Sequence, residues 1–306
     1  MNADSGKVTT VMDELPGANL GWLRDGGLWV ESSDVTHVLQ HDAHSTFRVA
    51  STQQVWSPDG ASLAYVMPQL DGTPAIYILD VTSHNPYAVA SGLAPVWSPD
   101  GTQLAFWSGV AVNGPHSADR MLNLAQIQIA DVAGHSVWTL VHRDDLLYNI
   151  HQQGVKVGDI AWSPDGKFLA VTMGRPGSNS DLFVLDADTG AIKVHLPSNL
   201  DAPCLECGWT SLEPNQAWSP DSRYVAAWAT SADAWFGESG HVLVLDVQTG
   251  KQLALPGVGI WAWHPTGHWL AVPQNPNGIL LVTPDLACMH WLDTPQCSSL
   301  AWRPVQ

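Results

Sequence analysis

The sequence predicts an all-β fold assembled from repeated four-stranded antiparallel units, and three observations carry this prediction. First, one short segment recurs six times around a tryptophan, with spacings of 41, 65, 56, 45 and 39 residues. Second, alternating apolar runs typical of β-strands stand on either side of most copies. Third, Ser-Pro-Asp-Gly or a variant of it separates these runs, and this sequence favours a tight turn. A shared minimum spacing of about 40 residues is typical of stacked supersecondary units.

Each repeated residue has a structural role in this interpretation. In the turn, Pro presets the backbone of the first central position, and Gly takes the left-handed position that closes a three-residue hairpin. The broad indole ring ends the inner strand and is expected to wedge against the neighbouring unit. The motif residues are Trp56, Asp59, Trp97, Asp100, Trp162, Asp165, Trp218, Asp221, Trp263 and Trp302.

A third apolar run follows in each unit, as at residues 75–80, 181–186 and 241–246. Turns such as Asp188-Thr189-Gly190 then lead to a fourth strand. Four antiparallel strands for every 40 residues or so, repeated radially, form a β-propeller.

The two chain ends predict how the propeller closes. Residues 20–39 parallel the second to fourth strands of a unit, and the last copy stops after its inner strand, at Leu300-Ala301-Trp302. We therefore expect six blades, closed by the C-terminal inner strand joining the N-terminal strands. Alternatively, Trp22-Leu23-Arg24-Asp25-Gly26 is a degenerate motif of its own, which favours seven blades. We expect residues 1–17 to form a tail, which can be disordered, and residues 18–306 to form a single propeller domain.

The Trp-Ser-Pro-Asp-Gly segments resemble the TolB-type propeller repeat, a relative of the WD repeat, over nearly the whole chain. The resemblance implies a β-propeller fold. TolB is periplasmic and contacts peptidoglycan-linked lipoproteins and a translocation system. Because this fold hosts many unrelated activities, the resemblance identifies no partner for this chain.

Composition excludes several classes of function. There are 12 Lys and Arg against 29 Asp and Glu, so the formal charge is 12 − 29 = −17, which argues against nucleic-acid binding. No apolar run is long enough to span a membrane, and the first 20 residues lack the apolar core of a signal peptide. The low lysine content and four cysteines favour an extracytoplasmic or periplasmic setting, and a cytoplasmic setting stays open.

Every long insertion is expected on one end of the strands, where second-to-third loops and unit-to-unit connections lie. We call this end the loop face and the opposite end, with its short turns, the turn face. Long loops in a compact repeat fold usually carry function, whereas the alternative is neutral drift in length. The insertions are Ser108–Asn123, Val141–Gly158, Gly174–Ser180, Pro197–Asn215 and Ala229–Gly240.

Candidate binding residues follow from this placement. Aromatic side chains outside the repeat pattern favour a protein or carbohydrate partner, or else fold back as a small core of their own loop. Residues just before the inner strands are expected to ring the channel mouth. The candidates are Trp209, Trp235, Phe236, His116, Arg120, His151, Asp159, Gln53 and Gln216.

The cysteines and histidines give weaker signals. A disulfide between Cys204 and Cys207 would staple a long loop, and the pairing of Cys288 with Cys297 stays open. The pair His41 and His44 has a metal-compatible spacing only on a helical turn. We expect no cofactor, although a divalent metal stays open.

The sequence therefore favours a non-enzymatic binding scaffold that presents loops around a channel mouth to a protein partner, as a monomer or within a larger complex. One alternative is a propeller enzyme of lactonase or lyase type, which needs several convergent acids, amides or histidines at the ring. Another is a sensor module excised from a larger chain.

Overall fold

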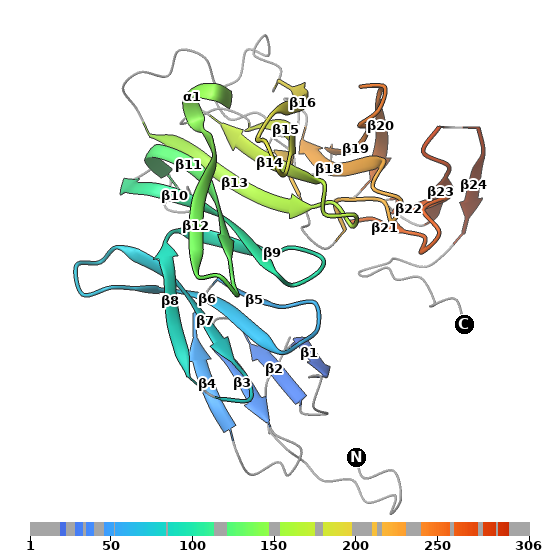
Figure 1. Ribbon diagram of the computed structural model, residues 1–306. Helices are drawn as coiled ribbons and strands as arrows, with labels where there is room; N and C mark the ends of the chain where they lie inside the picture. The colour runs from blue at the N-terminus through green and yellow to red at the C-terminus, as the bar shows by residue number, and fades with distance from the viewer. Residues whose placement is uncertain are drawn as a thin grey trace, which may run out of the picture. The chain divides into compact units, whose positions relative to one another are not determined.

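A computed structural model describes residues 19–22, 28–32, 35–39, 46–51, 53–83, 85–112, 121–146, 154–174, 180–197, 210–212, 216–230, 240–257, 260–274, 278–285 and 287–293 (Figure 1). Within them lie twenty-four strands and one four-residue helix, so the predicted all-β fold is confirmed. The strands form five antiparallel sheets, four of four strands and one of eight. Residues 1–95 and 96–306 are separate compact units. None of the described segments is a helix long and apolar enough to cross a bilayer.

The first compact unit contains two four-stranded sheets, each with its strands in sequence order. The strands are β1 (Asn19–Trp22), β2 (Leu28–Ser32), β3 (Val35–Leu39), β4 (Thr46–Ala50), β5 (Gln54–Trp56), β6 (Ser62–Pro68), β7 (Pro74–Asp80) and β8 (Pro86–Ser91). Val49 packs in a buried cluster with Leu63, Tyr65 and Leu79, so β4 contributes to the same core as β6 and β7.

The order of the N-terminal strands differs from the sequence prediction. Residues 20–39 were expected to supply the second to fourth strands of a unit, but β4 pairs with β3 and takes the fourth place. The reason is visible in the sequence, because Phe47-Arg48-Val49-Ala50-Ser51 repeats the pattern of Tyr87-Ala88-Val89-Ala90-Ser91 in β8. The expected closing strand at residues 300–302 lies outside the described residues, so blade number and closure stay predictions.

The second compact unit contains the remaining sheets. Its eight-stranded sheet consists of two four-stranded meanders, β9–β12 and β13–β16, joined where β11 pairs with β13. Strands and helix are β9 (Leu93–Trp97), β10 (Gln103–Val112), β11 (Met121–Asp131), β12 (Ser136–His142), α1 (Arg143–Leu146), β13 (Val155–Trp162), β14 (Phe168–Gly174), β15 (Ser180–Asp186), β16 (Ile192–Leu196), β17 (Thr210–Ser211), β18 (Tyr224–Thr230), β19 (Gly240–Asp246), β20 (Gln252–Gly257), β21 (Ala262–Trp263), β22 (Leu270–Pro273), β23 (Ile279–Val282) and β24 (Met289–Leu292).

The Ser-Pro-Asp-Gly turns are built around one repeated set of hydrogen bonds. In the turn after β13, Ser163 Oγ donates to Asp165 Oδ1 at 2.7 Å and accepts the N–H of Phe168 at 2.9 Å. The same pair of bonds recurs from Ser57, Ser98 and Ser219. Gly60, Gly101, Gly166 and Gly267 have φ between 67° and 76°, as predicted for the left-handed position.

Motif tryptophans of the second compact unit tie neighbouring four-stranded meanders together. Trp162 Nε1 donates to Val96 O at 3.3 Å, and Trp218 Nε1 donates to Ala161 O at 3.0 Å. In each case the acceptor is the residue before the tryptophan of the preceding repeat, so the predicted wedge is also a hydrogen bond. In the last described repeat, Trp261 takes this role and donates to Gln216 O at 2.8 Å.

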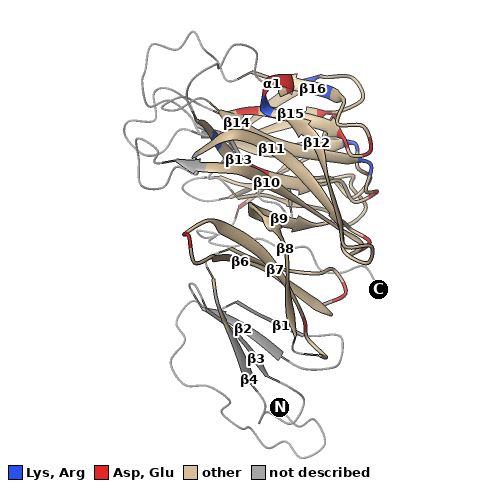
Figure 2. Ribbon diagram, turned by 60° about the vertical axis from the view of Figure 1, so that its left-hand side comes forward, with Lys and Arg blue, Asp and Glu red and all other residues tan. Residues whose placement is uncertain are grey.

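Apolar side chains fill the space between these meanders. One buried cluster joins Ala161 and Val184 to Trp218 and Leu245, from β13, β15 and the following repeat. A second joins Tyr224 and Val244 to Trp261, Trp263 and Leu270. Acidic side chains lie mainly at strand ends and turns (Figure 2), which leaves the strands free to pack through apolar residues.

Candidate functional site

The described strand ends of the second compact unit define its loop face. β10 ends at Val112 and β11 begins at Met121, and likewise β14 ends at Gly174 before β15 begins at Ser180. Because the pairing is antiparallel, the end of each second strand lies beside the start of the third and the start of the first. All five predicted insertions therefore leave and re-enter the sheets at the same end, whereas the Ser-Pro-Asp-Gly turns lie at the other.

The hairpin formed by β10 and β11 is distorted next to the loop face. The register shifts between Ser108 and Val110, so Gly109 lies opposite two residues of β11. Gly109 has φ 152°, and a Cβ there would lie 2.7 Å from Asn123 O, which explains the need for glycine. Leu124 on the other strand has φ 53°, an unfavourable conformation for a leucine.

The same hairpin exposes apolar side chains. Leu124 is 69 % exposed and Val110 is 58 % exposed. The strand is held in place from the other side, because Met121 and Leu122 of β11 pair with Lys156 and Val155 of β13. The hairpin is therefore a fixed, strained and apolar projection at the face that carries the insertions.

The residues expected to ring the channel mouth connect neighbouring repeats instead. In the first compact unit, Gln53 Oε1 accepts the N–H of Ala94 at 2.7 Å. In the second, Asp159 Oδ2 accepts the N–H of Leu212 at 3.1 Å. Gln216 is exposed, and its main-chain oxygen accepts the bond from Trp261. Each of these residues thus has a structural contact that sequence reasoning did not foresee.

The remaining loop candidates lie outside the described residues. These are Trp209, Trp235, Phe236, His116, Arg120 and His151, together with Trp302 and the pair Cys204 and Cys207. Cys297 lies outside as well, whereas Cys288 is exposed with a free thiol. Among the described side chains, no group of three or more His, Cys, Asp and Glu residues could hold a metal ion.

A paired histidine at the outer edge of the second meander was missed by sequence reasoning. His195 Nε2 lies 2.8 Å from Asp181 Oδ2, and the imidazole stacks on Phe183 with ring centroids 4.3 Å apart. Phe183 and His195 are direct partners in the β15–β16 register. The alternation of outward-facing Asp181 and Phe183 was the only signal in the sequence. The contact fixes β16 to β15.

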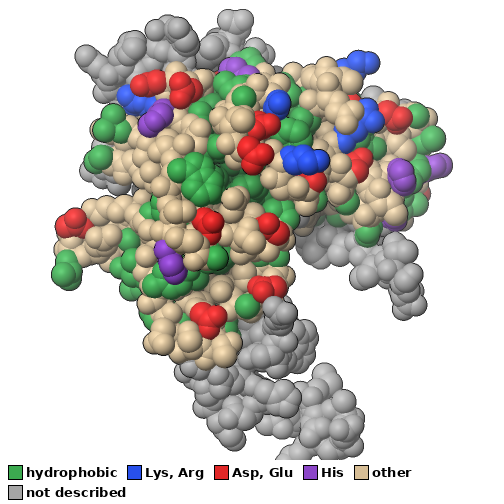
Figure 3. Space-filling model, in the orientation of Figure 1, with side chains coloured by type: hydrophobic (Ala, Val, Ile, Leu, Met, Phe, Trp, Pro, Cys, Tyr) green, Lys and Arg blue, Asp and Glu red, His purple; other side chains and the backbone are tan. Residues whose placement is uncertain are grey.

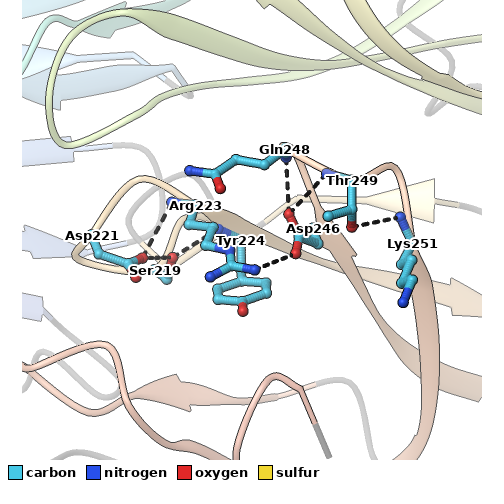
Figure 4. A network of polar contacts seen from close by, with 8 residues as sticks. All are labelled: Ser219, Asp221, Arg223, Tyr224, Asp246, Gln248, Thr249 and Lys251. Carbon is cyan, nitrogen blue, oxygen red and sulfur yellow. Dashed lines mark hydrogen bonds and ion pairs between the residues drawn. The ribbon is translucent and has the colours of Figure 1, made fainter.

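A polar network on the turn face was also missed. Arg223 Nη2 lies 2.8 Å from Asp246 Oδ2, and Asp246 Oδ1 accepts the N–H groups of Gln248 and Thr249 at 2.9 and 3.2 Å (Figure 4). The guanidinium of Arg223 also stands 4.9 Å from the centroid of the Tyr224 ring. The network joins the turn before β18 to the turn after β19.

The charges of this network reinforce each other. Burial raises the pKa of Asp246, but hydrogen bonds from Arg223, Thr249 and Gln248 outweigh it, and the pKa lies below its ordinary value. The hydrogen bond to Asp246 holds the pKa of Arg223 above its ordinary value. Lysines on this face pair in the same way, Lys167 with Asp165 at 3.4 Å and Lys193 with Asp186 at 3.6 Å. Basic side chains therefore stand beside acidic ones on the surface (Figure 3).

Comparison with known proteins follows the fold. A family model described as the anaphase-promoting complex subunit 4 WD40 domain matches residues 121–211. One component of eukaryotic translation initiation factor 3, the subunit designated B, is 36 % identical over 73 residues in Candida albicans and 29 % identical over 112 residues in Chaetomium globosum. These matches cover 24 % and 35 % of this chain, and only 10 % and 14 % of the relatives.

Solved structures agree on the architecture. The Dos1 propeller has a TM-score of 0.58 at 10 % identity, covering 92 % of this chain and 70 % of its own. Oligogalacturonate lyase in complex with manganese has a TM-score of 0.57 at 12 % identity, covering 92 % and 77 %. TolB from Agrobacterium tumefaciens has 0.48 at 19 % identity, covering 91 % and 90 %.

These features define the class of protein as a β-propeller built from WD-like repeats. The predicted resemblance to the TolB-type and WD repeats is confirmed at the level of the fold. The propeller fold and the WD40 match support a protein-interaction scaffold.

Proposed function

We propose that this chain is a non-enzymatic scaffold that binds a protein partner at its loop face. The observation that carries the proposal is the β10–β11 hairpin, where exposed Leu124 has a left-handed backbone. A leucine in that conformation costs about 1–3 kcal/mol of folding free energy, and its side chain gains little in water. A function in which a partner buries the side chain explains why such a residue occurs there.

Burial by a partner offers a favourable term of the right size. Covering a leucine or valine side chain contributes about 1.5–3 kcal/mol, so Leu124 and Val110 together suffice to anchor an interface. The pairing of β11 with β13 holds the hairpin in place before binding, which lowers the entropic cost of association.

The aromatic loop residues extend the proposal. Trp235 and Phe236 belong to the insertion that follows β18, and Trp209 to the one that precedes β17, so both segments join the same end of the sheets as the hairpin. We propose that they complete the partner surface around the apolar pair Val110 and Leu124. An extracytoplasmic location is also part of the proposal and is supported only by composition.

The experiment compares capture of a partner from an extract of the source organism by matched variants. Leu124→Asn with Val110→Ser removes the apolar pair, and Asn tolerates the left-handed backbone. A chain with residues 229–240 replaced by a Gly-Ser linker tests Trp235 and Phe236. Ile192→Ser is the control, because Ile192 is 42 % exposed but begins β16 at the turn face. We expect one discrete partner to be retained by the control and lost from the other two.

A further inference from the structure

A cavity of about 270 Å³ opens on the turn face between the sheet β17–β20 and the sheet β21–β24. Its polar lining comes from Arg223, Tyr224, Thr249, Lys251, Gln252 and Asp285, beside the Asp246 carboxylate described above. Figure 4 shows the guanidinium of Arg223, the ring of Tyr224 and the ammonium end of Lys251 extending to the same side of the Asp246 turn.

The acceptors of this cavity are already occupied. Asp246 accepts two main-chain N–H groups and the Arg223 guanidinium, as described above. Asp285 Oδ1 accepts the N–H of Ala287 at 3.0 Å. The turns therefore use the carboxylates for their own stability.

The donors are not fully used. Within the described part of the chain, Arg223 Nε is buried without an acceptor, and Lys251 forms no ion pair, unlike Lys167 and Lys193. Thr249, Gln252 and Tyr224 add neutral donors. Behind Tyr224, the indole of Trp263 stacks at 6.3 Å, and its buried Nε1 also lacks an acceptor among the described residues. The free hydrogen-bonding capacity of the cavity thus consists of donors.

We propose that this cavity binds a carboxylate, supplied either by an Asp or Glu side chain of a protein partner or by a free dicarboxylate. Arg223 and Lys251 provide charge-assisted hydrogen bonds to it, and the rings and aliphatic side chains of the lining exclude water. The four ionisable groups Arg223, Lys251, Asp246 and Asp285 sum to zero, which is unusual in a chain of formal charge −17.

A second cavity of similar volume on the turn face shows the contrast. It is lined by Asp100 and Asp165 together with Gln103 and Trp162, and its described lining contains no Lys or Arg. A carboxylate would be repelled there. The proposed site is therefore specific to the sheets β17–β20 and β21–β24 and is not a general property of the turns.

The test measures fluorescence anisotropy of a labelled hexaglutamate peptide with the full chain, at constant ionic strength. Lys251→Gln removes the free cation. Lys193→Gln is the matched control, because Lys193 is on the same face outside the cavity. We expect saturable binding that Lys251→Gln weakens by about tenfold or more, as for the loss of one charged hydrogen bond. Lys193→Gln should change it less than about twofold.

Competition by sodium succinate separates the two sources of the carboxylate. Displacement of the peptide indicates that a free dicarboxylate suffices, whereas binding that depends on Lys251 but resists succinate indicates an acidic protein segment. Absence of saturable binding, or equal weakening by the Lys251 and Lys193 variants, would overturn the proposal. Arg223→Lys provides a second variant that keeps the charge facing Asp246 but removes the planar fork, and it should also weaken binding.

Discussion

Asp165 donates its main-chain N–H to Ser222 Oγ at 3.0 Å, and this bond links the Ser-Pro-Asp turns of two consecutive repeats. Ser222 stands where the other repeats have glycine and has φ 60°. The side chain that strains the turn is thus the same one that connects it to its neighbour.

Substitution of Ser222 separates these two effects. Ser222→Ala keeps the strain and loses the bond, so it should lower the free energy of unfolding by about 1 kcal/mol. Ser222→Gly loses the bond but removes the strain, so its stability should lie within about 0.5 kcal/mol of the parent. Urea unfolding of the two variants measures the difference. Equal losses would show that the backbone of Ser222 is unstrained.

The tryptophans give a second matched pair. Trp218→Phe removes a buried hydrogen bond to Ala161 O along with part of the ring, whereas Trp263→Phe removes a similar volume and no hydrogen bond to a described residue. Trp218→Phe should therefore cost about 1–3 kcal/mol more in unfolding free energy than Trp263→Phe. If thermal and urea unfolding place the two variants level, the indole bonds between repeats contribute nothing to stability.

Two glycines with the same backbone test crowding between repeats. Gly190 and Gly250 both have φ 71°, but a Cβ at Gly190 would collide with Leu140 O, while Gly250 faces open space. Gly250→Ala should cost about 1–2 kcal/mol from the left-handed backbone alone. Gly190→Ala should cost at least about 1 kcal/mol more, because main-chain atoms must shift. Similar melting temperatures for the two variants would contradict the close approach of Leu140.

Acid should destabilise the turns. The hydrogen bond from Ser98 Oγ, followed by that from the N–H of Thr102, holds the pKa of Asp100 below its ordinary value. Because the folded pKa is depressed, this contribution is complete above the unfolded pKa of about 3.9 and is lost as pH falls through the folded pKa.

Ser98→Ala should therefore lower stability at neutral pH and flatten the acid limb of the stability profile. Urea unfolding between about pH 6 and about pH 2.5 measures both effects. An acid limb unchanged by the substitution would show that Asp100 titrates normally despite its contact.

Much of the fold could be predicted from the sequence because its repeats carry their own local rules. The Ser-Pro-Asp-Gly turns, the left-handed glycines and the long insertions at one face all follow from residue types and spacing. The N-terminal strand order could not, because β4 lacks a flanking motif and its likeness to β8 appears only when the two are aligned.

The polar sites were less accessible to sequence reasoning. Arg223 and Asp246 are 23 residues apart, and both occur at turn positions where charged residues are ordinary. Nothing in the pattern indicates that one faces the other or that Lys251 lines the same cavity. Asp159 was expected at a channel mouth, whereas its carboxylate accepts a bond from Leu212, because the loops approach the strand ends in a way that spacing does not encode.

The central claim is that the loop face binds a protein partner through an apolar hairpin. The most direct measurement is capture from an extract by the parent, by Leu124→Asn with Val110→Ser, and by the Ile192→Ser control, after equal melting temperatures establish that all three are folded. The account predicts one discrete protein retained by the parent and the control and absent from the hairpin variant. Equal retention by all three would contradict it.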